Sequence, residues 1–303
     1  MWWATSFATM LAVYKTYLEP AKAYPALWRL ILGLFTILVV YLLWTFAVFF
    51  VAWIVDGKPA DLTPWLVRMA STQNFAGTVA VLGTFGGMAL GPIVAARLLH
   101  GRGPRSLFGP AARTLHDFGF AMAVASVVLA ASLVVWRLGN LPVPNLTLGL
   151  WLSLLPLTIG LVLVQTGAEE LVFRGYLQSQ LAARFASPFI WLLVPALLFG
   201  LAHPNPNVDP VTGLLIMGSA SIFGFYAGDL TARTGSIGAA WGIHFSINFV
   251  AIGLLATQGT ITGLSLFQTP YAIAEVSDSR GAFIGNFIVM SLIWIVVRRL
   301  LSR

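Results

Sequence analysis

Two adjacent glutamates and an arginine lie between apolar stretches of the chain. Glu169, Glu170 and Arg174 follow the uncharged run 148–165, and the chain becomes apolar again at Pro188. A charged side chain at membrane depth costs about 2.5–3.5 kcal/mol on insertion scales, so an intramembrane carboxylate indicates a functional site. The two glutamates are therefore the first candidates for catalysis.

The spacing within this group predicts two different roles. On a helix, Glu170 and Arg174 lie one turn apart on the same face and can form an ion pair. Glu169 is rotated by about 100° and shares its face with Phe173. We expect Arg174 to neutralise Glu170, which leaves Glu169 to face another group. A purely structural ion pair would explain the first contact, but it does not need the second carboxylate.

Two histidines and an asparagine lie in later apolar runs. His203 directly precedes Pro204, which ends the helix, so the imidazole lies at a helix C-terminus beside a loop. Phe199, one turn earlier, can wall a pocket. His244 and Asn248 are four residues apart and share a helix face. Taken singly, these side chains could form a helix cap or hydrogen bonds between helices.

Taken together, these polar groups predict a hydrolytic site. A carboxylate and an imidazole, here Glu169 and His203, can activate a water as general base and then protonate a leaving amine. An imidazole and a carboxamide, here His244 and Asn248, can donate hydrogen bonds to an oxyanion. The chain has no cysteine and no Gly-x-Ser-x-Gly motif, so water is the better nucleophile. The expected chemistry is hydrolysis of an acyl bond.

The composition indicates a polytopic membrane protein. The 303 residues are 58% hydrophobic and only 9% charged, whereas an ordinary soluble domain is about 25% charged. The absence of cysteine excludes disulfides and thiolate metal sites. An excess of Lys and Arg fits the cytoplasmic loops of a membrane protein, and no nucleic-acid partner is expected. The expected partners are the lipid bilayer and a peptide or protein substrate.

The apolar runs predict an all-α, polytopic transmembrane bundle of about eight spans, with a catalytic cavity embedded in the membrane. About 20 residues of helix cross the hydrocarbon core. Glycines in the second run favour close contact between helices. The expected spans are 30–55, 75–99, 118–135, 148–165, 189–202, 211–227, 237–256 and 283–297.

Glu169 and His203 can meet only if their helices place them at the same depth in the membrane. If every run crossed fully, Glu169 and His203 would lie at opposite ends of their helices and could not meet. Either the helix from Leu148 therefore continues past Glu169, or the segment 189–203 enters only part of the way.

The chain is expected to form one integral unit with four parts. These are an interfacial segment 1–28, transmembrane helices 29–145, a catalytic core 146–258, and a loop with the last helix, 259–303. Tyr14 and Tyr17 are expected at the headgroup level. The loop 97–113 has four arginines and no acid, so it and both termini are expected on the cytoplasmic side, in the plasma membrane of a prokaryote.

Three motifs in this order resemble those of the CPBP family of glutamate intramembrane endopeptidases. This family of CAAX proteases and bacteriocin-processing proteins, also called Abi, includes the type II CAAX prenyl protease. The resemblance covers residues 148–255, and the segment 234–237 also resembles the family's approach to its last motif. The motifs are Glu169-Glu170-x-x-x-Arg174, Phe199-x-x-x-His203 and His244-x-x-x-Asn248.

The resemblance implies an intramembrane endopeptidase. Glu169 would polarise the attacking water with help from His203, and His244 and Asn248 would form the oxyanion hole. The second glutamate and the arginine of the first motif would hold the helix in place. The best-known members cleave prenylated C-terminal tails, but nothing in this sequence specifies such a substrate. We expect a membrane-associated peptide or tail that enters laterally or from the cytoplasmic side.

Three alternatives remain open. A zinc protease could use Glu169, His203 and His244 as ligands, with water as the fourth, although the His-Glu-x-x-His motif is absent. The preferred interpretation needs no cofactor. A non-catalytic immunity or scaffold protein could bind a peptide with the same groups. A transporter could use Asp229 in a proton relay, although an ion pair with Arg233 is the simpler role for that carboxylate.

Overall fold

The structure is a computed structural model that describes residues 13–278 and 280–301. Its helices form an all-α bundle with one small sheet. Among the described residues, six helices are long and apolar enough to cross a membrane, and the segments Phe189–Leu201 and Gly238–Leu254 are shorter apolar helices. Each of the eight expected apolar segments is therefore helical over most of its length, although residues 255–256 of the last segment but one belong to a strand, and the chain is an integral membrane protein.

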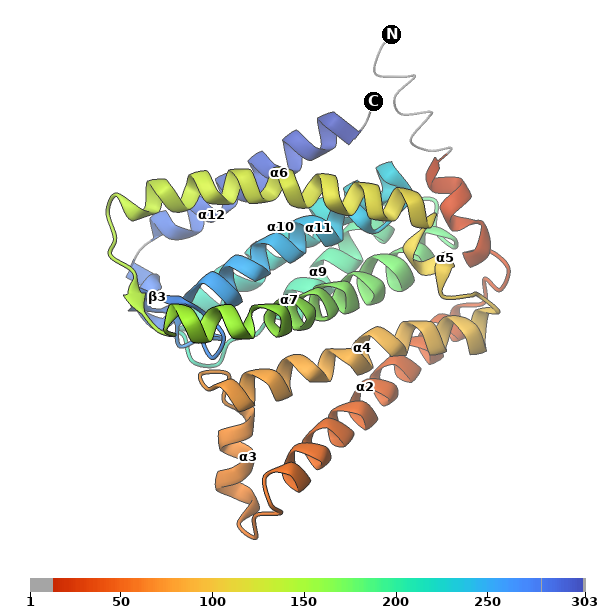
Figure 1. Ribbon diagram of the computed structural model, residues 1–303. Helices are drawn as coiled ribbons and strands as arrows, with labels where there is room; N and C mark the ends of the chain where they lie inside the picture. Colours follow the sequence, from red (N-terminus) through yellow and green to blue (C-terminus); the bar gives the residue numbers. More distant parts are fainter. Residues whose placement is uncertain (1–12, 279, 302–303) are drawn as a thin grey trace.

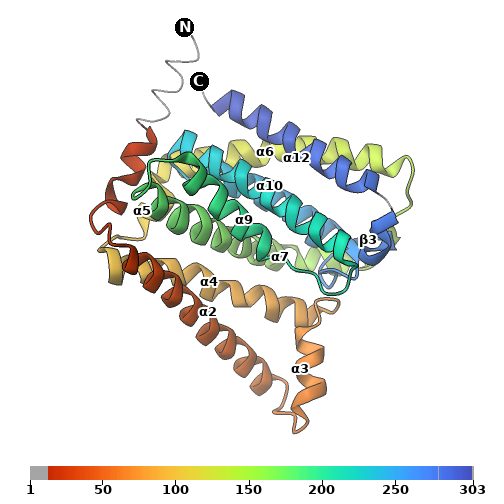
Figure 2. The same ribbon diagram turned by 180° about the vertical axis from the view of Figure 1, so that it is seen from behind.

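The long helices form three layers in both views (Figures 1 and 2). Helices α6 and α12 lie on one side, α7, α9, α10 and α11 lie in the middle, and α4 and α2 lie on the other side. Their bounds are α2 (Leu27–Val55), α4 (Phe75–His100), α6 (Ala111–Arg137), α7 (Leu148–Glu170), α9 (Val194–Leu201), α10 (Pro210–Thr234), α11 (Gly238–Asn248) and α12 (Arg280–Leu301).

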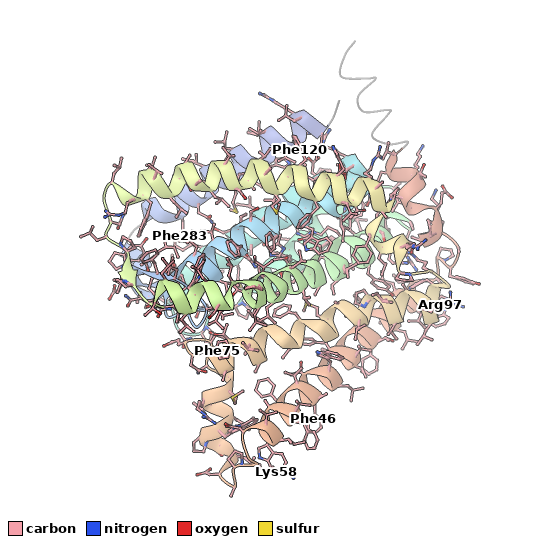
Figure 3. All side chains as sticks on the ribbon, in the orientation of Figure 1. Phe46, Lys58, Phe75, Arg97, Phe120 and Phe283 are labelled. Atoms are coloured by element: carbon pink, nitrogen blue, oxygen red, sulfur yellow. The ribbon has the colours of Figure 1, made fainter. Side chains whose placement is uncertain are left out.

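Helices α2 and α4 pack through glycine, as the sequence predicted. A Cβ at Gly86 would lie 2.9 Å from the Trp44 ring, and one at Gly91 would lie 3.0 Å from the Ile37 backbone. The two helices diverge toward α3 (Leu62–Ala70), which joins them (Figure 1). Figure 3 labels Lys58 in the loop between α2 and α3, at the point farthest from the rest of the bundle.

The helix that carries the glutamates does not end at Glu170. Helix α7 continues as the π-helix η2 (Leu171–Gln178) and then as α8 (Ser179–Ala182), so one helical segment of 35 residues extends past Glu169. The later segment Phe189–Leu201 is short. The first arrangement considered for bringing Glu169 and His203 together, a helix that continues past Glu169, is therefore present.

Two further π-helical segments lie in the central layer. They are η3 (Phe189–Leu193), which leads into α9, and η4 (Phe249–Leu254), which follows Asn248 directly. The π-helical geometry is rare and frequently occurs at functional sites. Two of the three candidate motifs therefore lie where α-helix changes to π-helix.

The two ends of the bundle differ. At one end lies a three-stranded sheet in the order β1-β3-β2, in which β3 is antiparallel to β1 and parallel to β2. Helix α5 (Arg105–Phe108), in the basic loop, lies at the other end (Figure 1). In Figure 3, Phe75 and Phe283 mark the sheet end and Arg97 marks the basic end. The strands are β1 (Val143–Pro144), β2 (Leu255–Gln258) and β3 (Phe267–Ala272).

The N-terminal segment differs in part from the interfacial role predicted for it. Residues 1–12 lie outside the described residues. Tyr14 and Tyr17 are buried in the main core, where Tyr17 donates a hydrogen bond to the Leu107 carbonyl at 2.7 Å. Tyr24 and Trp28 are exposed, as an interfacial position requires. The first two tyrosines therefore tie the segment to the bundle. The remaining short helices are η1 (Glu19–Ala21) and η5 (Ile273–Asp278).

Candidate active site

The two glutamates lie where α7 enters the interior of the bundle. Every residue from Gln165 to Leu181 is buried. Gly167 faces Trp241 of α11, where a Cβ would come within 2.8 Å of the indole ring. On its other side, α11 lies against α6 through Gly238 and Gly242. These close approaches place the face of α11 that carries His244 beside the end of α7.

Glu170 binds two side chains, Arg174 and His244. Its Oε1 accepts hydrogen bonds from Arg174 Nη1 at 3.2 Å and from His244 Nδ1 at 2.8 Å. Glu170 and Arg174 are fully buried. The Arg174 guanidinium also lies 4.6 Å from the centre of the Phe199 ring. The predicted ion pair is therefore confirmed, and His244 is a third member that the spacing did not indicate.

Glu169 faces a different set of groups. Its Oε1 accepts a hydrogen bond from Gln165 Nε2 at 2.7 Å. Its Oε2 lies 3.5 Å from His244 Nε2 and has no hydrogen-bond partner among the described residues. Glu169 is thus held at one oxygen by Gln165, while its other oxygen is buried beside His244 without a hydrogen bond.

His244 lies between the two carboxylates. A ring that donates Nδ1–H to Glu170 has on Nε2 either a proton to donate or a lone pair to accept one. The sequence interpretation assigned His244 to an oxyanion hole with Asn248, but here both of its nitrogens face carboxylates.

Asn248 joins the site through a residue that the sequence interpretation missed. Its Nδ2 donates a hydrogen bond to Gln165 Oε1 at 2.9 Å, and Gln165 in turn donates to Glu169. An amide nitrogen carries two hydrogens, so Asn248 has a second one for a substrate oxygen. The sequence feature that could have identified Gln165 is its position, one turn before Glu169 at the end of an otherwise apolar run.

His203 follows the end of α9 and is partly exposed. Its Nδ1 donates a hydrogen bond to the Phe199 carbonyl at 2.7 Å, and the two rings lie 4.6 Å apart. In the neutral ring, this bond leaves the lone pair on Nε2, where it can accept a proton. Phe199 therefore orients His203 as well as lining the pocket, and α9 itself packs on α10 and η2 (Figure 2).

One cavity of about 610 Å³ brings the four candidate catalytic side chains together. Glu169, His203, His244 and Asn248 all line it, as does Phe199, whose predicted role as a pocket wall is confirmed. Apolar side chains of α4, including Phe85 and Met88, complete much of its wall. The cavity reaches the surface at Ala202 and Asn286, which are exposed near the sheet end of the bundle.

The side chains considered for zinc do not form a ligand cluster. Within residues 13–278 and 280–301, no three His, Cys, Asp or Glu side chains lie together as metal ligands. His203 Nδ1 is bonded to a carbonyl, and both nitrogens of His244 face glutamates. The zinc protease stays an alternative that the chelator test below addresses.

The acidic residue considered for a proton relay has a structural partner. Asp229 pairs with Arg233 at 3.0 Å, which confirms the simpler role predicted for it. Asp229 also accepts a hydrogen bond from Trp294 Nε1 of α12 at 3.0 Å. The carboxylate therefore joins α10 to α12.

Comparison with known proteins agrees with the motifs. Residues 150–250 match the Rce1-like family of type II CAAX prenyl endopeptidases. This Rce1-like region contains every candidate site residue and lies within the expected catalytic core 146–258. The resemblance to CAAX proteases is thereby confirmed for this part of the chain.

One curated relative overlaps the chain in part. The Bacillus subtilis (strain 168) protein YyaK, which is described as uncharacterized, is 32% identical over 112 residues. The match covers 36% of this chain and 37% of YyaK. No solved structure matches the chain.

Proposed function

We propose that the Rce1-like region hydrolyses a peptide bond with Glu169 as general base. The observation that carries this proposal is the Oε2 atom of Glu169. It is buried, it has no hydrogen-bond partner among the described residues, and its side chain lines the same cavity as His203 and Asn248. A carboxylate oxygen held in this way can accept a proton from water.

The proposed reaction needs only water and the peptide. Glu169 takes a proton from water while the water oxygen bonds to the scissile carbonyl carbon. The second amide hydrogen of Asn248 stabilises the oxyanion. The C–N bond then breaks, and the leaving nitrogen takes the proton that Glu169 received, so that the products are a carboxylic acid and an amine. His203 assists in orienting the water, and Glu170 and Arg174 hold the helix.

The cavity suggests how a substrate enters. Its wall is largely apolar and it opens near the sheet end, between the end of α9 and α12. We propose that a membrane-associated peptide or C-terminal tail enters there or laterally from the bilayer. With the basic loop on the cytoplasmic side of a prokaryotic plasma membrane, the sheet end would face the opposite side, so the proposal replaces the cytoplasmic entry expected from the sequence and keeps the lateral one. The proposal includes no cofactor.

The test is cleavage of a fluorogenic peptide library, which includes prenylated tails, by the purified protein in liposomes. Wild type is compared with Glu169→Ala and His203→Ala, each with and without a chelator. We expect cleavage by the wild type that is lost in Glu169→Ala, strongly reduced in His203→Ala and unaffected by the chelator.

Other outcomes separate the alternatives. Equal cleavage by wild type and Glu169→Ala contradicts the proposed base. Loss of wild-type cleavage with the chelator supports the zinc protease. A biological effect that persists in Glu169→Ala supports a non-catalytic immunity or scaffold protein.

A further inference from the structure

We propose that Gln165 is a positioning residue for this reaction. It determines which oxygen of Glu169 faces the substrate and which way the Asn248 carboxamide is turned. The inference rests on the proposed function, and it concerns a residue outside the three motifs.

The contacts of Gln165 join the proposed base to the proposed oxyanion donor. Gln165 is 5% exposed. Its Nε2 donates to Glu169 Oε1 at 2.7 Å, and its Oε1 accepts from Asn248 Nδ2 at 2.9 Å. Both ends of one side-chain amide are therefore used, each by a residue that lines the cavity.

The direction of these bonds follows from donor and acceptor chemistry. An ionised carboxylate only accepts hydrogen bonds, so the amide nitrogen of Gln165 must face Glu169. The carbonyl oxygen of Gln165 then faces Asn248, which must present its NH₂ group. The charge of Glu169 thus fixes the orientation of Asn248 two hydrogen bonds away, and it does so only through Gln165.

Two consequences for the chemistry follow. Because Oε1 of Glu169 is held by Gln165, Oε2 is the oxygen left without a hydrogen bond beside His244, in a side chain that lines the cavity. Because Asn248 gives one amide hydrogen to Gln165, its other hydrogen has a defined direction. Without Gln165, the carboxylate could turn and the Asn248 amide could flip. Misplacement by about 1 Å can cost about 100-fold in rate.

Gln178 offers a matched control on the same helical segment. It is also a buried glutamine, 1% exposed, and it donates a hydrogen bond to the Gly228 carbonyl at 3.0 Å. It contacts none of the proposed catalytic groups. Replacing either glutamine with methionine removes one buried amide of similar size, so general effects on folding should be similar.

The first experiment measures kcat and KM for Gln165→Met and Gln178→Met in liposomes. We expect Gln165→Met to lower kcat about 10- to 100-fold, with KM changed less than about threefold. Gln178→Met should keep the wild-type kcat. The thermal midpoint of each variant is measured as well, so that a loss of kcat can be told apart from a loss of folded protein. A wild-type kcat in Gln165→Met, or an equal loss in both variants, overturns the inference.

A double-mutant cycle tests the link to Asn248. If Gln165 acts through the orientation of Asn248, Gln165→Met should lower kcat less in the Asn248→Ala background than in the wild type. If the fold-loss of kcat in the double variant equals the product of the two single losses, the link is contradicted.

A second readout does not depend on peptidase activity. The hydrogen bond from Gln165 holds one oxygen of Glu169, and a carbodiimide reacts faster with a carboxyl group that is free to turn toward it. Labelling of Glu169, measured by mass spectrometry, should be faster in Gln165→Met than in the wild type or Gln178→Met. Equal labelling in all three proteins overturns the inference. A wild type that cleaves no peptide but shows this labelling difference contradicts the proposed function and leaves the positioning role standing.

Discussion

The two halves of the long helical segment Leu148–Ala182 have opposite surroundings. In the first half, large apolar side chains such as Leu148 and Leu152 are exposed. In the second half, every residue from Gln165 to Leu181 is buried, including both glutamates and Arg174. The charged residues of this segment lie inside, and the exposed side chains of its first half are mostly apolar, as expected beside lipid, where an exposed charge is costly.

The two halves also differ in how closely other helices approach. Gly160, in the first half, has open space where a side chain would be. Gly167, in the second half, faces Trp241, whose Nε1 is held by hydrogen bonds of 3.2 Å to Leu163 and Thr166. The comparison teaches that the second half is enclosed by other helices, whereas the first half is held on one face and exposed on the other, and the enclosed half carries the two glutamates.

The largest expected effect comes from Glu169→Gln in the buried half. Loss of the proposed base should lower kcat about 10²- to 10⁴-fold. The thermal midpoint should change little, since Oε2 makes no hydrogen bond in the folded protein. Kinetics and thermal unfolding of the same preparation check both parts. A large fall in the midpoint would assign Glu169 to folding instead.

Glu170→Gln should act mainly on stability. It removes the negative charge that Arg174 and His244 share, and breaking a buried ion pair costs about 3–5 kcal/mol. The free energy of unfolding in detergent should fall by an amount of this order. An unfolding curve that matches the wild type would contradict the division of roles between the two glutamates. Leu152→Ala, in the exposed half, serves as a control that should unfold like the wild type.

The fold and much of the candidate site could be predicted from the sequence. Bilayer thickness sets the length of an apolar run, so the eight apolar segments were identifiable. Spacing of four residues on a helix identified Glu170 with Arg174 and His244 with Asn248. Glu170 and Arg174 make the predicted contact, and His244 and Asn248 line the same cavity; the polar pattern alone was enough because each pair lies within one helical segment.

The features that were not predicted depend on contacts between distant segments. His244 meets the glutamates only because glycines let α11 approach α6 and α7 closely. Gln165 is neutral and ends an apolar run, so its link to Asn248 requires the three-dimensional arrangement. The strands β1 and β3 pair residues far apart in the chain and are too short to show alternation.

Gly167→Ala should destabilise the buried half by about 1–3 kcal/mol, the usual effect of overpacking. The added methyl group would push against Trp241, which cannot turn away without losing its hydrogen bonds to α7. Thermal unfolding in detergent measures the effect. No change in the midpoint would mean that α11 is less closely held against α7 than the contacts indicate.

Gly160→Ala is the matched substitution in the exposed half and should have the smallest effect. The methyl group meets no atom within 4 Å, and alanine favours a helix over glycine by about 1 kcal/mol. The thermal midpoint should stay the same or rise slightly. A fall as large as that of Gly167→Ala would remove the distinction between the two halves.

The central claim is that Glu169 activates water and does not itself attack the peptide. The most direct measurement is a single turnover in H₂¹⁸O with enzyme in excess, followed by mass spectrometry of the cleaved peptide. We predict one ¹⁸O atom in the new carboxylate of the first-turnover product. An unlabelled carboxylate would show that an oxygen of the enzyme was transferred, and it would contradict the account.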